Sequence, residues 1–151
     1  MALTLLVTGG TRSGKSNFAE ERARDFGQNI GKRLVYIATA EAFDEEMTAR
    51  IARHQRRRGP EWHTVHAPLD LVRAVTQTDG KGPCVIDCLT LWLSNLMLAG
   101  QDTEVAADAL VASLASRADP VILVTNEVGS GIVPENALAR RFRDEAGRLN
   151  Q

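Results

Sequence analysis

The stretch LTLLVTGGTRSGKS at residues 3–16 restricts the fold more than any other part of the chain. Its apolar first half predicts a strand over residues 3–8, and the periodic segment after it predicts a helix. The turn between them matches the pattern G-x-x-x-x-G-K-[ST] with Gly9, Gly10, Thr11, Arg12, Ser13, Gly14, Lys15 and Ser16. Such a turn between a strand and a helix predicts a nucleotide-binding domain of the α/β class.

The same turn indicates which part of a nucleotide is bound. Its glycines allow consecutive backbone N–H groups to face phosphates at a helix N-terminus, where the helix dipole favours anions. Lys15 is expected near the β- and γ-phosphates, and the Ser16 hydroxyl is expected to bind Mg²⁺. Arg12 fits either a phosphate contact or an exposed position, and the sequence leaves both open.

The composition is that of one compact domain. The 151 residues, 44% hydrophobic and 25% charged, fit a single domain over residues 1–151. A net charge of -1 disfavours general binding of nucleic acid, so a small-molecule substrate is expected. No stretch approaches about 18 consecutive apolar residues, which predicts no membrane span and a cytoplasmic location. Cys84 and Cys88 lack a second pair to complete a zinc site and are interpreted as reduced structural thiols.

Strand and helix signals alternate along the chain. Strands are predicted over residues 3–8, 33–39, 62–65, 83–87 and 120–125. Helical patterns fill the intervals; the first is expected to end near Gly27 and the second to span residues 41–57. Asp102 is placed to cap a helix that would present Val105, Ala109 and Leu114 to the core. The alternation predicts three layers, with helices on both faces of a mostly parallel sheet.

Asp87 stands at the end of the strand predicted in PCVIDCLT. An acidic residue at this place is typical of the second Mg²⁺ contact in proteins with such a phosphate loop. A strand-terminal aspartate also commonly caps the helix that follows it. We take Asp87 as the candidate for the metal and keep the capping role as the alternative.

The segment EAFDEEMTARIARHQRRRGPEW places one histidine among several arginines. His54 continues an apolar stripe of the second predicted helix, and this spacing alone favours a buried structural histidine. The cluster of arginines changes the expectation, because guanidinium groups this close need water or anions, and a nucleotide triphosphate supplies anions. Nearby cations also keep an imidazole neutral and able to attack phosphorus. The arginines are Arg50, Arg53, Arg56, Arg57 and Arg58.

Other motifs narrow the class of reaction. A switch GTPase would read guanine with N-K-x-D after a strand, whereas VTNEVGSG gives Asn-Glu-Val-Gly at residues 126–129. His63 and His66 have no metal-ligand partner at suitable spacing and are interpreted as structural or rim residues. The sequence therefore favours a metabolic phosphotransferase over a signalling module.

Four segments together resemble a known family: LLVTGGTRSGKS, VYIATAEAFDEEMTARIARHQRRRGPEW, IDCLTLWLSNLM and VTNEVGSGIVPENALARRFRDEAGRLNQ. They are similar to the bifunctional adenosylcobinamide kinase / adenosylcobinamide-phosphate guanylyltransferase of cobalamin biosynthesis, over essentially the whole chain. The resemblance implies a P-loop NTPase with a RecA-like sheet. It also implies two reactions. Adenosylcobinamide is phosphorylated on its aminopropanol hydroxyl with ATP or GTP, and GMP is then transferred from GTP to that phosphate with release of pyrophosphate.

The resemblance also assigns individual residues. In the family, GMP is carried on the histidine of an Arg-Ile-x-x-His motif, which here is His54. Asp87 is implied as the acid on the Mg²⁺ side, together with Ser16, while Asn126 and Glu127 are implied to face cobinamide. Further nucleotide contacts are implied at Ala38, Thr39, Ala40, Gln55, Arg56, Arg57 and Arg58.

Two departures from the family pattern affect what is expected. His66 stands where the family often has an acid, so a carboxylate contact to the nucleotide is not expected there. The sequence stops at GRLNQ, whereas family members usually continue to a final apolar strand, so residues 1–151 are expected to lack that strand. The resemblance to the family also implies a homo-oligomer, and a homotrimer is the expected assembly.

Two other functions remain compatible with the phosphate loop. A monofunctional P-loop small-molecule kinase would phosphorylate its acceptor without ever becoming guanylylated. A GTP-dependent regulatory or binding module would bind nucleotide and transfer nothing. The missing N-K-x-D makes the regulatory module the weaker of the two.

Overall fold

Five parallel strands form one sheet in the protein, which we describe from a computed structural model over residues 3–10, 13–41, 45–126 and 137–151. The strands are β1 (Thr4–Gly9), β2 (Leu34–Ala38), β3 (Trp62–His66), β4 (Cys84–Asp87) and β5 (Val121–Asn126). Their order across the sheet is β1-β5-β4-β2-β3, and each neighbouring pair is parallel. The predicted strands and their parallel arrangement are confirmed.

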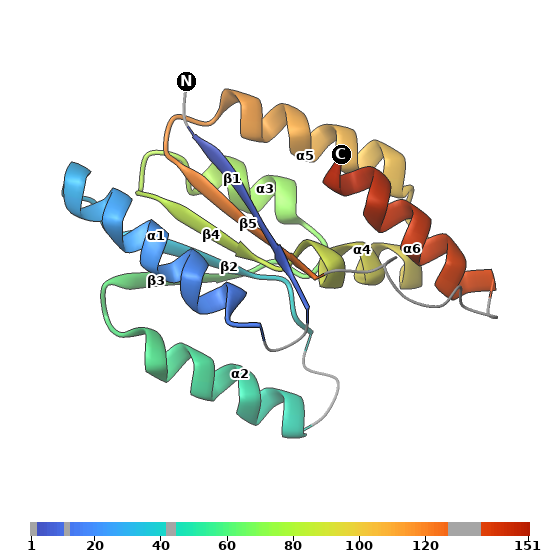
Figure 1. Cartoon of the computed structure of the whole chain (residues 1–151), viewed down its shortest axis with the longest axis horizontal. Coiled ribbons are helices and arrows are strands. Elements are labelled where there is room, and N and C mark those ends of the chain that lie inside the picture. The colour runs from blue at the N-terminus through green and yellow to red at the C-terminus, as the bar shows by residue number, and fades with distance from the viewer. Residues whose placement is uncertain (1–2, 11–12, 42–44, 127–136) are drawn as a thin grey trace.

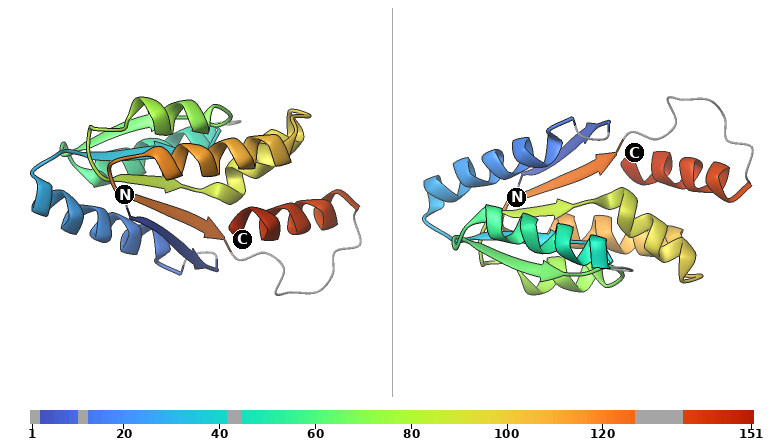
Figure 2. Two further views of the ribbon diagram at one scale, coloured as in Figure 1. Left: turned by 90° about the horizontal axis from the view of Figure 1, so that it is seen from above. Right: turned by 90° about the horizontal axis from the view of Figure 1, so that it is seen from below.

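Helices cover both faces of this sheet (Figure 1). Those described are α1 (Lys15–Ile30), α2 (Glu45–Arg58), α3 (Leu71–Gln77), α4 (Leu89–Leu98), α5 (Thr103–Ser116) and α6 (Ala137–Asn150). Helix α1 lies on one face, and α3 and α5 lie on the opposite face (Figure 2). The predicted three-layer α/β fold is confirmed. Among the described helices, none combines the length and the apolar character needed to cross a lipid bilayer.

Alternate residues of strand β2 enter two separate cores. Val35 packs on the side of α3, in a cluster with Leu71. The next residue, Tyr36, packs on the side of α1, in a cluster with Ala19. All five residues of β2 are buried, and burial on both faces explains why the strand lacks the apolar and polar alternation of a sheet exposed on one side.

Helix α1 extends further than the sequence predicted. It was expected to end near Gly27 but continues to Ile30, and Gly31 ends it in the left-handed conformation with a φ of 65°. Gly27 serves another purpose, because a Cβ atom there would lie 2.7 Å from Cδ2 of Leu34 at the start of β2. The glycine that looked like a helix terminator therefore allows the helix to approach the sheet.

The helices on the other face include one whose position the sequence did not delimit and one whose buried side it assigned only in part. Helix α3 has only seven residues, too few for a clear periodic signal. Asp102 is confirmed as the N-cap of α5, since its Oδ1 accepts hydrogen bonds from the N–H groups of Glu104 and Val105. The prediction for its core face is confirmed for Leu114, which packs against the core beside the buried Leu110, and wrong for Val105 and Ala109, which are exposed.

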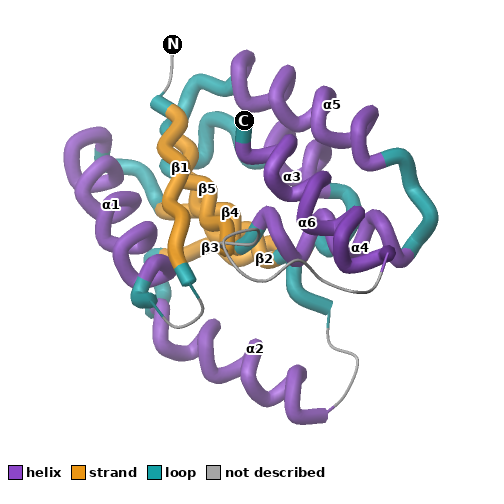
Figure 3. Tube along the Cα trace, turned by 45° about the vertical axis from the view of Figure 1, so that its right-hand side comes forward, coloured by secondary structure: helices purple, strands orange, loops and turns teal. Residues whose placement is uncertain are grey.

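Helix α2 lies at the edge of the sheet where β2 and β3 pair (Figure 3). Its C-terminal turn approaches α1, because Nη2 of Arg57 donates a 3.1 Å hydrogen bond to Oδ1 of Asn17. Two acidic residues in its first turn and three arginines in its last turn complement the helix dipole. The basic end of α2 is therefore held beside the first turn of α1.

A buried carboxylate, Asp119, joins the turn after α1 and the turn before β4 to the segment that leads into β5. Its Oδ1 accepts a 3.0 Å hydrogen bond from Nζ of Lys32, and its Oδ2 accepts one of 3.0 Å from the N–H of Gly82. Burial alone would raise the pKa of Asp119, but these hydrogen bonds outweigh burial and hold the pKa below its ordinary value. The ionised form of Asp119 is thus the one that stabilises the fold.

We expect this carboxylate to make the protein sensitive to acid. A group whose pKa is lowered by folding contributes stability above its unfolded pKa, and the contribution is lost as the pH falls through the folded pKa. Asp119→Asn should therefore lower the free energy of unfolding by about 1–3 kcal/mol at pH 7, and the difference from wild type should shrink below about pH 4. Urea unfolding between pH 2.5 and pH 7 measures it. Asp25→Asn, an exposed position on α1, is the control, and a difference for Asp119→Asn that does not change with pH would contradict the assignment.

Candidate nucleotide site

The glycine-rich turn connects the end of β1 to the start of α1. Gly14 immediately precedes α1 with a φ of 84°, a left-handed conformation that favours glycine. The turn is tight, because the N–H of Ser13 donates to the carbonyl of Gly10 and a Cβ atom on Gly9 would lie 2.6 Å from Oγ of Ser13. Thr11 and Arg12 lie outside the described residues. The described part of the loop places the N-terminus of α1 where phosphates are expected to bind.

Two polar side chains of the first α1 turn extend toward the loop and the sheet. Nζ of Lys15 donates a 2.9 Å hydrogen bond to the carbonyl of Gly10. Oγ of Ser16 donates a 3.0 Å hydrogen bond to Oδ2 of Asp87 at the end of β4. The structure thus brings together residues that are 71 positions apart in the sequence. A hydroxyl and a carboxylate this close are oxygen donors of the kind that Mg²⁺ prefers.

Asp87 does not cap the helix that follows it. The residue that precedes α4 is Cys88, and no side chain there makes a capping hydrogen bond. The carboxylate of Asp87 instead accepts hydrogen bonds from Ser16 and from the hydroxyl of Tyr36 on β2. Of the two roles considered for Asp87, the capping role is therefore wrong.

Thr39 follows β2, and its polar groups all have partners within the protein. Its N–H donates to the carbonyl of Asp87 at 3.1 Å, and its hydroxyl exchanges hydrogen bonds with the backbone of Cys88. Nδ2 of Asn95 on α4 donates to the Thr39 carbonyl at 2.8 Å. Thr39 therefore joins the end of β2 to the start of α4. Its neighbours Ala38, which is buried, and Ala40, which is partly exposed, lie at the same end of the sheet.

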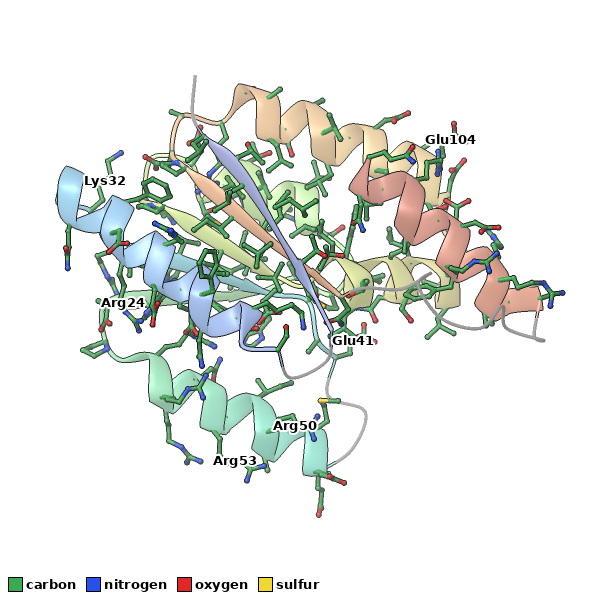
Figure 4. All side chains as sticks on the ribbon, viewed as in Figure 1. Arg24, Lys32, Glu41, Arg50, Arg53 and Glu104 are labelled. Carbon is green, nitrogen blue, oxygen red and sulfur yellow. The ribbon has the colours of Figure 1, made fainter. Side chains whose placement is uncertain are left out.

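The arginines of α2 occupy different environments, although they are adjacent in the sequence. Arg50 and Arg53 are exposed on α2 (Figure 4), and Arg56 is also exposed. Arg57 is exposed but bonded to Asn17 beside the phosphate loop. Arg58 is only 5% exposed, and its Cζ lies 3.6 Å from the centroid of the Tyr36 ring. The position of Arg58 supports a contact within the protein rather than the predicted contact with nucleotide.

Gln55 and His66 form a pair between α2 and the end of β3. Nε2 of Gln55 lies 2.8 Å from Nε2 of His66. His66 also lines a cavity of about 300 Å³, together with Ala40, Glu41, Thr48, Ile51 and Pro68. The expectation that His66 is a rim residue agrees with its exposed position.

Four of the predicted functional side chains lie outside the described part of the structure. His54 belongs to α2, one turn before Arg58, and its side chain is outside the described residues. Asn126 ends β5 directly beside Gly9 of β1, so it stands next to the phosphate loop. Glu127, its predicted companion on the cobinamide side, is outside the described residues, as are Thr11 and Arg12.

The thiols of Cys84, at the start of β4, and Cys88, directly after β4, are poor nucleophiles. Cys84 and Cys88 are buried and form no disulfide. Burial raises the pKa of Cys84 to about 12 and also raises the pKa of Cys88. Because the thiolate is the reactive form, both residues are unreactive at neutral pH, in agreement with their interpretation as structural thiols.

The sequence analysis missed Tyr36 and Asn95, which both contact predicted site residues. Tyr36 lies in the apolar run LVYIATA, where its ring looked like core, but a buried tyrosine hydroxyl usually has a hydrogen-bond partner. Asn95 lies in the apolar helix LTLWLSNLML, and a buried amide likewise needs partners. A polar atom inside an otherwise apolar element was the signal that could have identified both.

A phosphate loop between β1 and α1, with an acid from β4 hydrogen-bonded to its serine, defines the class of P-loop nucleotide-binding proteins. A sequence model for the family described as "Cobinamide kinase / cobinamide phosphate guanyltransferase" matches residues 5–151. The chain belongs to this family, which confirms the resemblance identified from the sequence. It is therefore an enzyme of the transferase class, and its family's kinase and guanyltransferase activities imply nucleotide substrates.

Curated relatives agree with the family match. The "Bifunctional adenosylcobalamin biosynthesis protein CobP" of Pseudomonas aeruginosa is 44% identical over 149 residues, which cover 97% of this chain and 84% of that protein. Two proteins named "Bifunctional adenosylcobalamin biosynthesis protein CobU", from Salmonella typhimurium and Escherichia coli, are each 40% identical over 165 residues. These alignments cover 99% of this chain and 88% of each relative.

Proposed function

We propose that the protein phosphorylates adenosylcobinamide with ATP or GTP and then transfers GMP from GTP to adenosylcobinamide phosphate through a guanylylated His54. The products are adenosyl-GDP-cobinamide and pyrophosphate. The observation that carries the proposal is the 3.0 Å hydrogen bond between Ser16 and Asp87 beside the phosphate loop, in a chain that the kinase and guanyltransferase family matches over residues 5–151.

In the kinase reaction, the protein binds and orients the triphosphate. Backbone N–H groups of the loop and the ammonium of Lys15 would bind the phosphate oxygens. Ser16 and Asp87 supply a hydroxyl and a carboxylate, which fit the oxygen ligands of Mg²⁺. When bound, Mg²⁺ would offset the negative charge on the phosphates. Lys15 contributes the same effect from the protein side.

In the guanylyl transfer, His54 is the proposed nucleophile. A neutral imidazole nitrogen attacks the α-phosphorus of GTP; an N–P bond forms, the bond between the α-phosphorus and its bridging oxygen breaks, and pyrophosphate leaves. The phosphate of adenosylcobinamide phosphate then attacks the same phosphorus, and the N–P bond breaks to release His54. Exposed arginines on α2, Arg50, Arg53 and Arg56, are available to balance the charge of the phosphates.

Several finer predictions accompany this proposal. Of the predicted nucleotide contacts, Arg57 is bonded to Asn17 in the first turn of α1, while Gln55 lies beside His66. The contact from Asn126 to cobinamide, the homotrimer, the cytoplasmic location, the single domain over residues 1–151 and the absence of a final strand all stay predictions.

Incubation of the protein with Mg²⁺, adenosylcobinamide and either ATP or GTP tests the proposal. We expect adenosylcobinamide phosphate with either nucleotide, and adenosyl-GDP-cobinamide plus pyrophosphate when GTP is present. Phosphorylation without GMP transfer would instead support the monofunctional kinase. Nucleotide binding without any product would support the regulatory module.

A further inference from the structure

Tyr36 connects the acid of the metal site to the C-terminal end of α2. We propose that Tyr36 is a positioning residue for Asp87 and that Arg58 holds the Tyr36 ring for this task. The inference rests on the proposed role of Asp87 in Mg²⁺ binding. It assigns a function to two buried polar side chains, of which the sequence singled out only Arg58, and for a different role.

The register of the sheet brings Tyr36 and Asp87 to the same face. Strands β2 and β4 are neighbours, with Tyr36 opposite Val85 and Ala38 opposite Asp87. Since alternate residues of a strand share a face, Tyr36 and Asp87 both point to the α1 side, one pleat apart. The phenol is long enough to span this distance, and its hydroxyl donates a hydrogen bond to Oδ2 of Asp87.

Both hydrogen bonds to the Asp87 side chain end on the same oxygen. Ser16 and Tyr36 each donate to Oδ2, and no described residue donates to Oδ1. Two donors on one oxygen restrict the rotation of the carboxylate, which leaves Oδ1 as the oxygen for a metal or a metal-bound water. The hydroxyl of Ser16 is itself a proposed metal ligand, so Tyr36 is the donor that acts on Asp87 alone.

Arg58 and Trp62 fix the ring of Tyr36 from two directions. Cζ of Arg58 lies 3.6 Å from the ring centroid, a cation–π contact in a site where Arg58 is only 5% exposed. Trp62 contacts the ring edge to face, with the centroids 5.9 Å apart and the planes at 84°. Burial raises the pKa of Glu20 on α1, and the positive charge of Arg58 partly offsets this effect. Arg58 thus contacts the ring and interacts electrostatically with a buried acid of α1.

Arg58 connects the ring of Tyr36 to the helix that carries the proposed nucleophile. Arg58 is the last residue of α2, and His54 lies one helical turn before it. Arg58, Tyr36, Asp87 and Ser16 therefore form a continuous series of contacts from the helix that carries the proposed nucleophile to the phosphate loop. This series connects the last turn of α2 to the two proposed metal ligands, Asp87 and Ser16.

Tyr36→Phe tests the inference, because it removes the hydroxyl and keeps the ring against Arg58 and Trp62. We expect the Mg²⁺ concentration for half-maximal phosphorylation of adenosylcobinamide to rise about tenfold, the effect of losing one hydrogen bond to a charged group. Binding of GTP in EDTA should be unchanged. A residue with only a structural role would not shift the Mg²⁺ requirement selectively.

Two further variants make the result decisive. Arg73→Met changes an exposed arginine on α3, on the other face of the sheet, and its Mg²⁺ requirement should match wild type. Arg58→Met loosens the ring but keeps the phenol, and should raise the Mg²⁺ requirement several-fold; it also serves as the test should Tyr36→Phe fail to fold.

The role of Tyr36 is overturned if Tyr36→Phe, or Arg58→Met in its place, keeps the wild-type Mg²⁺ requirement while Asp87→Asn raises it. If Asp87→Asn also leaves the requirement unchanged, then the proposed metal role of Asp87 fails, and with it the premise of the inference. If the wild-type protein shows neither phosphorylation of adenosylcobinamide nor GMP transfer, the result would instead contradict the proposed function.

Discussion

Replacement of His54 by alanine is expected to abolish the GMP adduct that the protein forms with GTP, while phosphorylation of adenosylcobinamide continues. The adduct requires a nitrogen that can attack phosphorus, and alanine provides none. Losing a covalent nucleophile should reduce guanylyl transfer by more than about a thousandfold. Lys15, Ser16 and Asp87, proposed for the kinase reaction, are unchanged in this variant. Intact-protein mass spectrometry after incubation with GTP and Mg²⁺ measures the adduct as a mass gain equal to GMP.

The chemistry of the adduct and a matched histidine variant provide the controls. A phosphoramidate bond to histidine is labile in acid and stable in base, so acid treatment should remove the added mass. His63→Ala changes an exposed histidine on β3 and should leave adduct formation at the wild-type level. Adenosylcobinamide phosphate should discharge the adduct from wild type. If the adduct persists in His54→Ala, the nucleophile is a residue other than His54.

The parts of the site that were predictable from sequence depend on local pattern. The phosphate loop is one contiguous motif between a strand and a helix, so Lys15 and Ser16 could be assigned without knowledge of the rest of the fold. Asp87 was identifiable because it ends an apolar strand, and strand ends meet at one edge of a parallel sheet. What the sequence left open was whether Asp87 faces the loop, and the hydrogen bond to Ser16 answers this.

The parts that were missed depend on contacts between distant segments. Tyr36 meets Asp87 only because β2 and β4 are neighbours in a particular register, and that register is not encoded in either strand alone. Arg58 could not be separated from the adjacent Arg56 and Arg57 by composition, although only Arg58 is buried. An arginine run suggested one phosphate-binding surface, whereas the fold divides it between solvent, α1 and the core.

The role of Thr39 likewise depends on contacts with distant segments of the chain. The resemblance placed it beside the nucleotide, and it does lie at the end of the sheet where the phosphate loop lies. Its hydroxyl, N–H and carbonyl nevertheless have partners in Cys88, Asp87 and Asn95. Thr39 can therefore lie beside the nucleotide site and still serve to hold the ends of β2 and β4 in place. The choice between these roles depends on hydrogen bonds that a sequence does not display.

Arg117→Ala is expected to cause the largest loss of stability among the changes considered, about 3–5 kcal/mol in the free energy of unfolding. Arg117 is 3% exposed, and its guanidinium donates to the carbonyls of Val75, Thr78 and Gly82 and to the hydroxyl of Thr78. Two of these carbonyls belong to the C-terminal end of α3, where the helix leaves them without partners of its own. Removing the guanidinium takes the charged donor from the carbonyls of Val75 and Gly82 at once, whereas the carbonyl of Thr78 keeps the N–H of Lys81.

A loss of this size in a domain of 151 residues should lower the melting temperature by on the order of 10 °C. Thermal and urea unfolding of Arg117→Ala measure it, with Arg73→Ala as the control because Arg73 is an exposed arginine on α3 itself. The control should change stability by no more than about 0.5 kcal/mol. Arg117→Lys keeps the charge but not the planar arrangement of donors, so it should restore only part of the loss. Equal stability of Arg117→Ala and Arg73→Ala would show that α3 and the turn before β4 do not depend on this guanidinium.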